Sequence, residues 1–140
     1  MTVASSVKAI KADIGGFFQA NGQLIFAPSA SGAQFATGRA SGKKFMYRLH
    51  IPTPKFGVFE KEQLALDYIK NSPMPVVIGP DEVNENSVQA ACTTVNLAKT
   101  CISDLFLRNE QRVVIEEFSG GTEFTLYVIT DGYHVLPLLP

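Results

Sequence analysis

The side chains best placed to bind a ligand are two neighbouring glutamates that interrupt an apolar run near the end of the sequence. Glu116 and Glu117 directly follow three β-branched apolar residues at 113–115. At the end of a strand such carboxylates lie beside backbone C=O and N–H groups, so the segment offers hydrogen-bond acceptors and donors together. The alternative interpretation is a solvated strand edge whose acidic side chains prevent pairing with other chains.

The main local group of cations comes much earlier, at Arg39, Lys43 and Lys44. The segment around them, 31–44, has the composition of a phosphate-binding loop, but its glycine and lysine spacing is not that of a P-loop. His50 and His134 are the only histidines, and neither has a cysteine or carboxylate at metal-ligand spacing, so we expect both at the surface.

The bulk composition is that of a soluble domain with a core. Of 140 residues, 46% are apolar and 18% charged, and the net charge of −1 gives no electrostatic reason to expect nucleic acid or a membrane surface as a partner. No apolar run approaches the ~20 residues that cross a bilayer, and the N-terminus lacks a signal-peptide core, which favours a cytoplasmic location. We expect Cys92 and Cys101 to be small buried residues and not a disulfide.

The periodicity predicts an α+β fold in which short strands alternate with helices before an antiparallel three-strand meander. Residues 1–22 are expected to form one amphipathic helix, the remnant of a preceding domain, and 23–140 a single lobe. Gly120-Gly121 and Asp131-Gly132 separate the meander strands, and Asp-Gly is a strong hairpin signal. The expected strands are 23–26, 55–59, 75–78, 112–118, 122–130 and 133–138. The expected helices are 41–49, 60–70 and a third one capped by Thr93 or Thr94. A helical turn capped by Ser29 or Ser31 and a polar loop at 79–86 complete the prediction.

Three segments in order resemble the ATP-grasp family, specifically ligases of the glycinamide ribonucleotide synthetase type. They are IFAPSASGAQF (25–35), KKFMYRLHIPTPKFGVF (43–59) and VVIEEFSGGTEFTLYVITDGYHVLPLLP (113–140). The resemblance implies an ATP-grasp-like nucleotide-side lobe truncated at its C-terminus. It also implies a nucleotide site: Glu116, Glu117, Phe118 and Ser119 would form the adenine hinge, Glu123 would accept hydrogen bonds from the ribose hydroxyls, and Arg39 would face the phosphates.

The sequence also departs from the family pattern. Arg39 stands where the family has a lysine, and Gly79 stands where it has a second one. The glycine-rich loop expected after that position is replaced by residues that include Asp81, Glu82 and Glu85. The family's magnesium ligands lie beyond the segment corresponding to Pro140, so we do not expect this chain to coordinate Mg²⁺ fully, and we expect ATP to bind weakly.

Two hypotheses therefore follow. The first is an ATP-grasp fragment or degenerate homologue, related to a carboxylate–amine ligase of purine biosynthesis, with weak or no ligase activity alone. The second is a non-catalytic assembly or nucleotide-sensing module that dimerises through an open sheet edge. Under the first, the natural partner is the remainder of a longer ligase.

Overall fold

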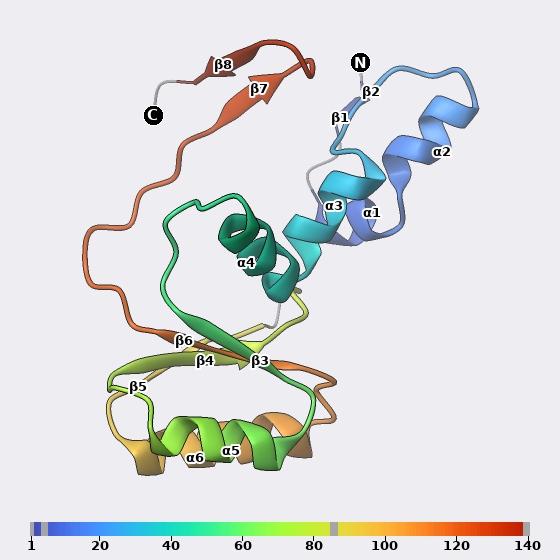
Figure 1. Cartoon of the computed structure of the whole chain (residues 1–140). Helices are drawn as coiled ribbons and strands as arrows, with labels where there is room; N and C mark the ends of the chain where they lie inside the picture. Colours follow the sequence, from blue (N-terminus) through green and yellow to red (C-terminus); the bar gives the residue numbers. More distant parts are fainter. Residues whose placement is uncertain (1, 4–5, 85–86, 139–140) are drawn as a thin grey trace.

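The main unit of the fold is a four-stranded antiparallel sheet. The computed structural model describes residues 2–3, 6–84 and 87–138 of the chain. The sheet has the strand order β3-β6-β4-β5 (Figure 1). Its strands are β3 (Phe56–Phe59), β4 (Val76–Pro80), β5 (Ala90–Cys92) and β6 (Val113–Glu117). β6 is thus an inner strand, hydrogen-bonded to β3 on one side and to β4 on the other.

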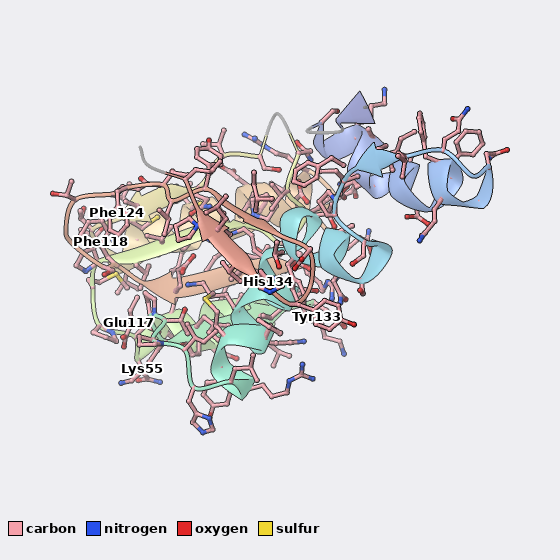
Figure 2. All side chains as sticks on the ribbon, turned by 90° about the horizontal axis from the view of Figure 1, so that it is seen from above. Lys55, Glu117, Phe118, Phe124, Tyr133 and His134 are labelled. Atoms are coloured by element: carbon pink, nitrogen blue, oxygen red, sulfur yellow. The ribbon has the colours of Figure 1, made fainter. Side chains whose placement is uncertain are left out.

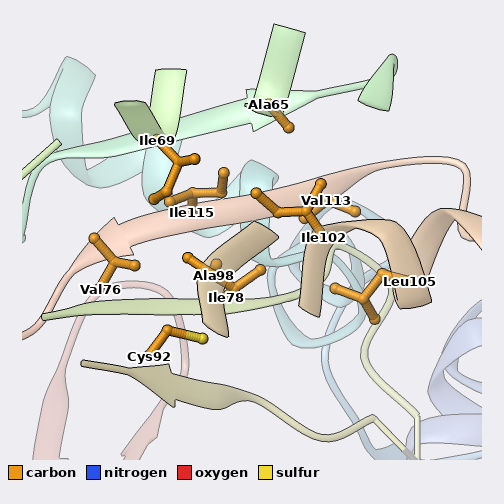
Figure 3. Packing of buried hydrophobic residues seen from close by; sticks show 10 residues of the cluster. All are labelled: Ala65, Ile69, Val76, Ile78, Cys92, Ala98, Ile102, Leu105, Val113 and Ile115. Carbon is orange, nitrogen blue, oxygen red and sulfur yellow. The ribbon is translucent and has the colours of Figure 1, made fainter. Parts of the chain in front are cut away.

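Two helices, α5 (Glu62–Lys70) and α6 (Val95–Leu107), cover one face of the sheet and form the hydrophobic core with it (Figure 3). Ile102 of α6 and Ile115 of β6 are fully buried there. The Thr94 hydroxyl accepts a hydrogen bond from the Leu97 N–H at 3.3 Å, which confirms the predicted cap of α6.

The buried face of α5 differs from the expected one. The helical spacing predicts that Leu64, Tyr68 and Ile69 face the core. Ile69 is buried as expected, whereas Leu64 and Tyr68 are exposed and Ala65 is buried in their place. The small Ala65 lets α5 pack close to its neighbours in the core.

A third helix, α4 (Arg39–Arg48), lies on the opposite side of the sheet from α5 and α6 (Figure 1). It follows α3 (Ala30–Thr37), whose N-cap is Ser29. Asp81, just after β4, fixes the start of α4. Its Oδ1 accepts a hydrogen bond from the Ala40 N–H at 2.7 Å, and its backbone oxygen accepts one from the Arg39 N–H at 2.9 Å.

The polar loop predicted at 79–86 is consequently wrong for its first residues. Positions 79 and 80 belong to β4, and Asp81 is buried, with its Oδ2 2.8 Å from Arg112 Nη2. Glu82 pairs with Lys11, and Glu85 lies outside the described residues. Asp81 therefore serves as a structural helix cap, because a carboxylate at a helix N-terminus satisfies free backbone N–H groups.

The single N-terminal helix predicted for 1–22 is also wrong. The segment forms β1 (Thr2–Val3), α1 (Val7–Lys11) and α2 (Ile14–Ala20), and β1 pairs in parallel with β2 (Ile25–Phe26). The break falls at Asp13, which has a φ of +50° and accepts a hydrogen bond from the Gly16 N–H at 3.2 Å. An aspartate that bonds to a nearby backbone N–H competes with helix continuation.

In the described residues up to 138 the C-terminal hairpin is present, but it does not continue β6 into a three-strand meander. β7 (Val128–Thr130) and β8 (Val135–Pro137) pair antiparallel around Asp131-Gly132, which confirms the predicted turn. The expected first strand, β6, has both of its hydrogen-bonding edges occupied by β3 and β4, so it cannot pair with the chain that follows it. The hairpin forms a separate two-stranded sheet (Figure 1).

The hairpin turn contains an aspartate with a depressed pKa. Asp131 Oδ1 accepts hydrogen bonds from the N–H groups of Tyr133 and His134, and its Oδ2 lies 3.0 Å from His134 Nδ1. The side-chain bond to His134, followed by the backbone bonds of His134 and Tyr133, lowers the pKa of Asp131 from 3.8 to about 2.

We predict that this turn is acid-sensitive. Because the folded pKa lies below the unfolded value, the carboxylate stabilises the turn above about pH 4, and this stabilisation is lost as the pH falls through about 2. An NMR titration of the Asp131 carboxyl carbon should have its midpoint near 2, and His134→Ala should raise that midpoint. Midpoints near 4 in both proteins would contradict the prediction.

Candidate nucleotide site

Glu116 lies on the side of the sheet that faces α4. Successive residues of a strand point to opposite faces, and Val113 and Ile115 belong to the core beneath α5 and α6. Glu116 therefore points the other way, together with its pairing partner Val77. Glu116, which breaks the apolar pattern of β6, therefore lies on the face of the sheet that is covered by the cationic residues of α4.

The Glu116 carboxylate forms ion pairs with two residues of α4. Oε1 pairs with Arg39 Nη2, and Oε2 pairs with Lys43 Nζ. All three side chains are largely buried, with 10%, 14% and 11% of the side-chain surface exposed for Arg39, Lys43 and Glu116. Lys43 Nζ also donates to Thr53 Oγ1 at 3.1 Å. The cluster of Arg39, Lys43 and Glu116 thus joins the helix to the sheet.

This cluster carries a net positive charge and an unused donor. Two cations and one carboxylate sum to +1. Within the described residues, Arg39 Nη1 is buried and has no hydrogen-bond partner. A buried donor without a partner costs free energy, about 1–3 kcal/mol by comparison with similar groups. An anionic group placed at Nη1 would satisfy the donor and compensate the charge.

Of the four predicted hinge residues, Glu116 belongs to this cluster, while Glu117 ends β6 and Phe118 and Ser119 follow the strand. The Glu117 N–H donates to Lys55 O at 2.9 Å and the Phe118 N–H donates to Pro75 O at 3.2 Å, so two backbone donors of the segment are already used. The Glu117 carboxylate lies 3.7 Å from Lys55 Nζ, and the two side chains are neighbours in Figure 2.

The remaining predicted contacts are exposed. Phe118, Ser119 and Glu123 lie on the connection between β6 and the hairpin, and Phe118 and Phe124 lie well away from the hairpin turn in Figure 2. Contact of these three residues with a nucleotide stays a prediction. No ligand contact was predicted for Lys43, although its spacing of four residues from Arg39 on one helix could have indicated a shared partner.

The site contains no cluster typical of a metal centre. In residues 2–3, 6–84 and 87–138, no group of three or more His, Cys, Asp or Glu side chains is arranged to hold a metal ion. None of the helices in this part of the chain has the length and apolarity needed to span a bilayer.

Solved structures define the class of fold. The chain superposes on a "RimK domain protein ATP-grasp" from Sphaerobacter thermophilus with a TM-score of 0.68 at 18% identity, over 79% of this chain and 42% of the other. It also superposes on a phosphoribosylamine–glycine ligase from Thermotoga maritima with a TM-score of 0.75 at 24% identity, over 81% of this chain and 30% of that one. The fold is therefore of the ATP-grasp type, and the mixed α+β prediction is confirmed.

Sequence comparison identifies the particular family. The family model described as "Phosphoribosylglycinamide synthetase, ATP-grasp (A) domain" matches residues 37–140. Phosphoribosylamine–glycine ligase of Neisseria meningitidis serogroup B is 33% identical over 98% of this chain and 34% of its own length. The enzyme of that name from Escherichia coli K12 is 34% identical over 86% of this chain and 29% of its own. The chain belongs to this ATP-grasp (A) domain family and spans about a third of the length of these relatives.

We predict that Glu116 is a major determinant of stability. Glu116→Gln removes the charge between two buried cations and should lower the free energy of unfolding by about 3–5 kcal/mol. Glu117→Gln breaks only the pair with exposed Lys55 and should cost at most about 1 kcal/mol. Urea unfolding of both variants measures these values, and equal costs would contradict the assigned cluster.

Proposed function

We propose that this chain is the nucleotide-side part of an ATP-dependent carboxylate–amine ligase and binds the phosphate groups of a nucleotide through Arg39. The observation that carries the proposal is the buried, unpartnered Nη1 of Arg39 in a cluster with a net charge of +1. Membership of the ATP-grasp (A) domain family supports a nucleotide as the source of the anion.

The cluster is suited to holding a phosphate in a fixed orientation. The Glu116 carboxylate pairs with Arg39 Nη2 and thereby fixes the plane of the guanidinium. Its second oxygen pairs with Lys43 Nζ. A guanidinium is planar and always charged, so fixing one of its nitrogens also fixes the direction of the other N–H groups. Arg39 therefore holds its free donor in place before a ligand arrives.

ATP, when bound to such a ligase, supplies the phosphoryl group that activates a carboxylate for attack by an amine. The residues of this chain contribute binding, orientation and charge compensation, which are the main protein contributions to phosphoryl transfer. A complete ligase also needs magnesium and a site for the carboxylate and amine substrates. We propose that the 140 residues alone have no ligase activity, that their partner is the remainder of such a ligase, and that they act in the cytoplasm.

The direct test is calorimetric titration with ATP and ADP. Arg39→Ala should weaken binding at least about tenfold, which corresponds to roughly 1.4 kcal/mol. Arg48→Ala is the matched control, since this arginine lies on the same helix but is exposed. Equal affinities for the two variants would contradict the role of Arg39.

Loss of binding in Glu117→Ala and Glu123→Ala would support the predicted adenine and ribose contacts. ATP-dependent product formation by the chain alone would overturn the proposed inactivity.

A specific observation also supports an assembly role. The hairpin formed by β7 and β8 has only two strands, and all six of their residues are exposed. Exposed aromatic residues adjoin these strands: Phe124 (85%) precedes β7, and Tyr133 (93%) lies in the turn. Two-stranded hairpins are marginal alone, and an apolar surface of this extent marks an interaction site. We propose a second copy of the chain as the occupant when no longer ligase is present.

Light scattering coupled to size exclusion tests this second role. The chain should elute as a dimer, and Val135→Glu in β8 should convert it to a monomer, because burying the introduced charge opposes association. Leu107→Glu places the same charge at an exposed leucine on α6 and should leave the dimer intact. A monomeric parent chain, or dissociation by both variants, would contradict dimerisation through the hairpin.

A further inference from the structure

The residue of the sheet next to the Arg39 guanidinium is a glycine, Gly79. Gly79 of β4 pairs with Val114 of β6, next to Glu116 and on the same side of the sheet. A Cβ at position 79 would lie 2.6 Å from Arg39 Nη1 and 3.1 Å from Gln89 Cγ. Such a short separation essentially never occurs between real Cβ atoms and their neighbours, so any other residue would displace the guanidinium or Gln89.

The glycine is not explained by backbone geometry. Gly22, Gly121 and Gly132 are the described glycines with positive φ, and Gly79 is not among them. The strand conformation of Gly79 suits any residue. A glycine within a strand weakens the strand, because it loses more backbone entropy on folding and has no side chain to pack. A glycine in such a position often marks the close approach of another group. Here the close group is the guanidinium of Arg39.

We propose that Gly79 is a positioning residue, which leaves the space in which the Arg39 guanidinium lies against the sheet with Nη2 on Glu116 and Nη1 free. The ligand in this inference, a phosphate group, rests on the proposed function; the positioning does not. Positions 39 and 79 thus act as a pair, in which the large cation on α4 requires the absence of a side chain on β4.

A second side chain, that of Gln89, borders the space over Gly79. Gln89 lies beside the guanidinium, and its side chain is exposed. Because Gln89 is exposed, we expect it to move aside without disturbing the pair between Arg39 and Glu116. A side chain at position 79, in contrast, would push the guanidinium itself out of its orientation and change both of its partners.

A double-mutant cycle without ligand tests the positioning. Gly79→Ala should lower the midpoint of thermal unfolding by about 3 °C or more in the parent chain. The drop should be clearly smaller in an Arg39→Lys background, because lysine has no guanidinium to displace. Gly42→Ala is the control, since a Cβ there meets nothing nearer than 4.0 Å and should act equally in both backgrounds. An equal drop for Gly79→Ala in both backgrounds would overturn the proposal.

Titration with ATP separates this inference from the proposed function. If the parent chain binds ATP, Gly79→Ala should weaken binding at least about tenfold, because the donor is misdirected; unchanged affinity would overturn the positioning role. If the parent chain does not bind ATP, the proposed function fails, and the thermal cycle alone decides the role of Gly79.

Discussion

The arrangement of this domain around its candidate site depends on one buried carboxylate held between two cations. Glu116 receives Arg39 and Lys43 from α4, and through them the helix is attached to the face of the sheet that α5 and α6 leave uncovered. Placing three charges where little water reaches them is costly, and only their mutual pairing offsets that cost. The same pairing sets the orientation of Arg39. One interaction thus contributes to both the fold and the candidate ligand site.

The surroundings of this interaction are arranged to support it. Asp81 caps the first turn of α4 and so fixes where Arg39 begins the helix. Gly79, two residues earlier, leaves room for the guanidinium. Gly79 near the end of β4 and Asp81 just after it therefore determine where α4 begins and how the Arg39 side chain lies against the sheet.

Local signals in the sequence were sufficient for much of the fold. Thr94 as the cap of α6, Ser29 as the cap of α3 and Asp131-Gly132 as a hairpin turn all depend on neighbours within a few residues, and all are confirmed. Features set by distant contacts were not predictable in this way. Asp81 caps a helix that begins 42 residues earlier, Glu116 meets its partners from 73 and 77 residues away, and β6 could not continue into a meander because β3 and β4 already flank it. The short β5, built from two alanines and a cysteine, has little strand propensity and was missed for that reason.

The free donor of Arg39 is expected to receive an anionic group. Side-chain ¹⁵N NMR of the guanidinium groups measures this most directly, since Arg39 is the buried arginine of the cluster and its N–H protons should exchange slowly enough to be observed. Adding ATP or pyrophosphate should shift the Arg39 Nη1 resonance and slow its proton exchange further, while the exposed Arg48 changes little. An Arg39 resonance that does not respond at saturating ligand, or that responds no more than Arg48, would contradict the claim.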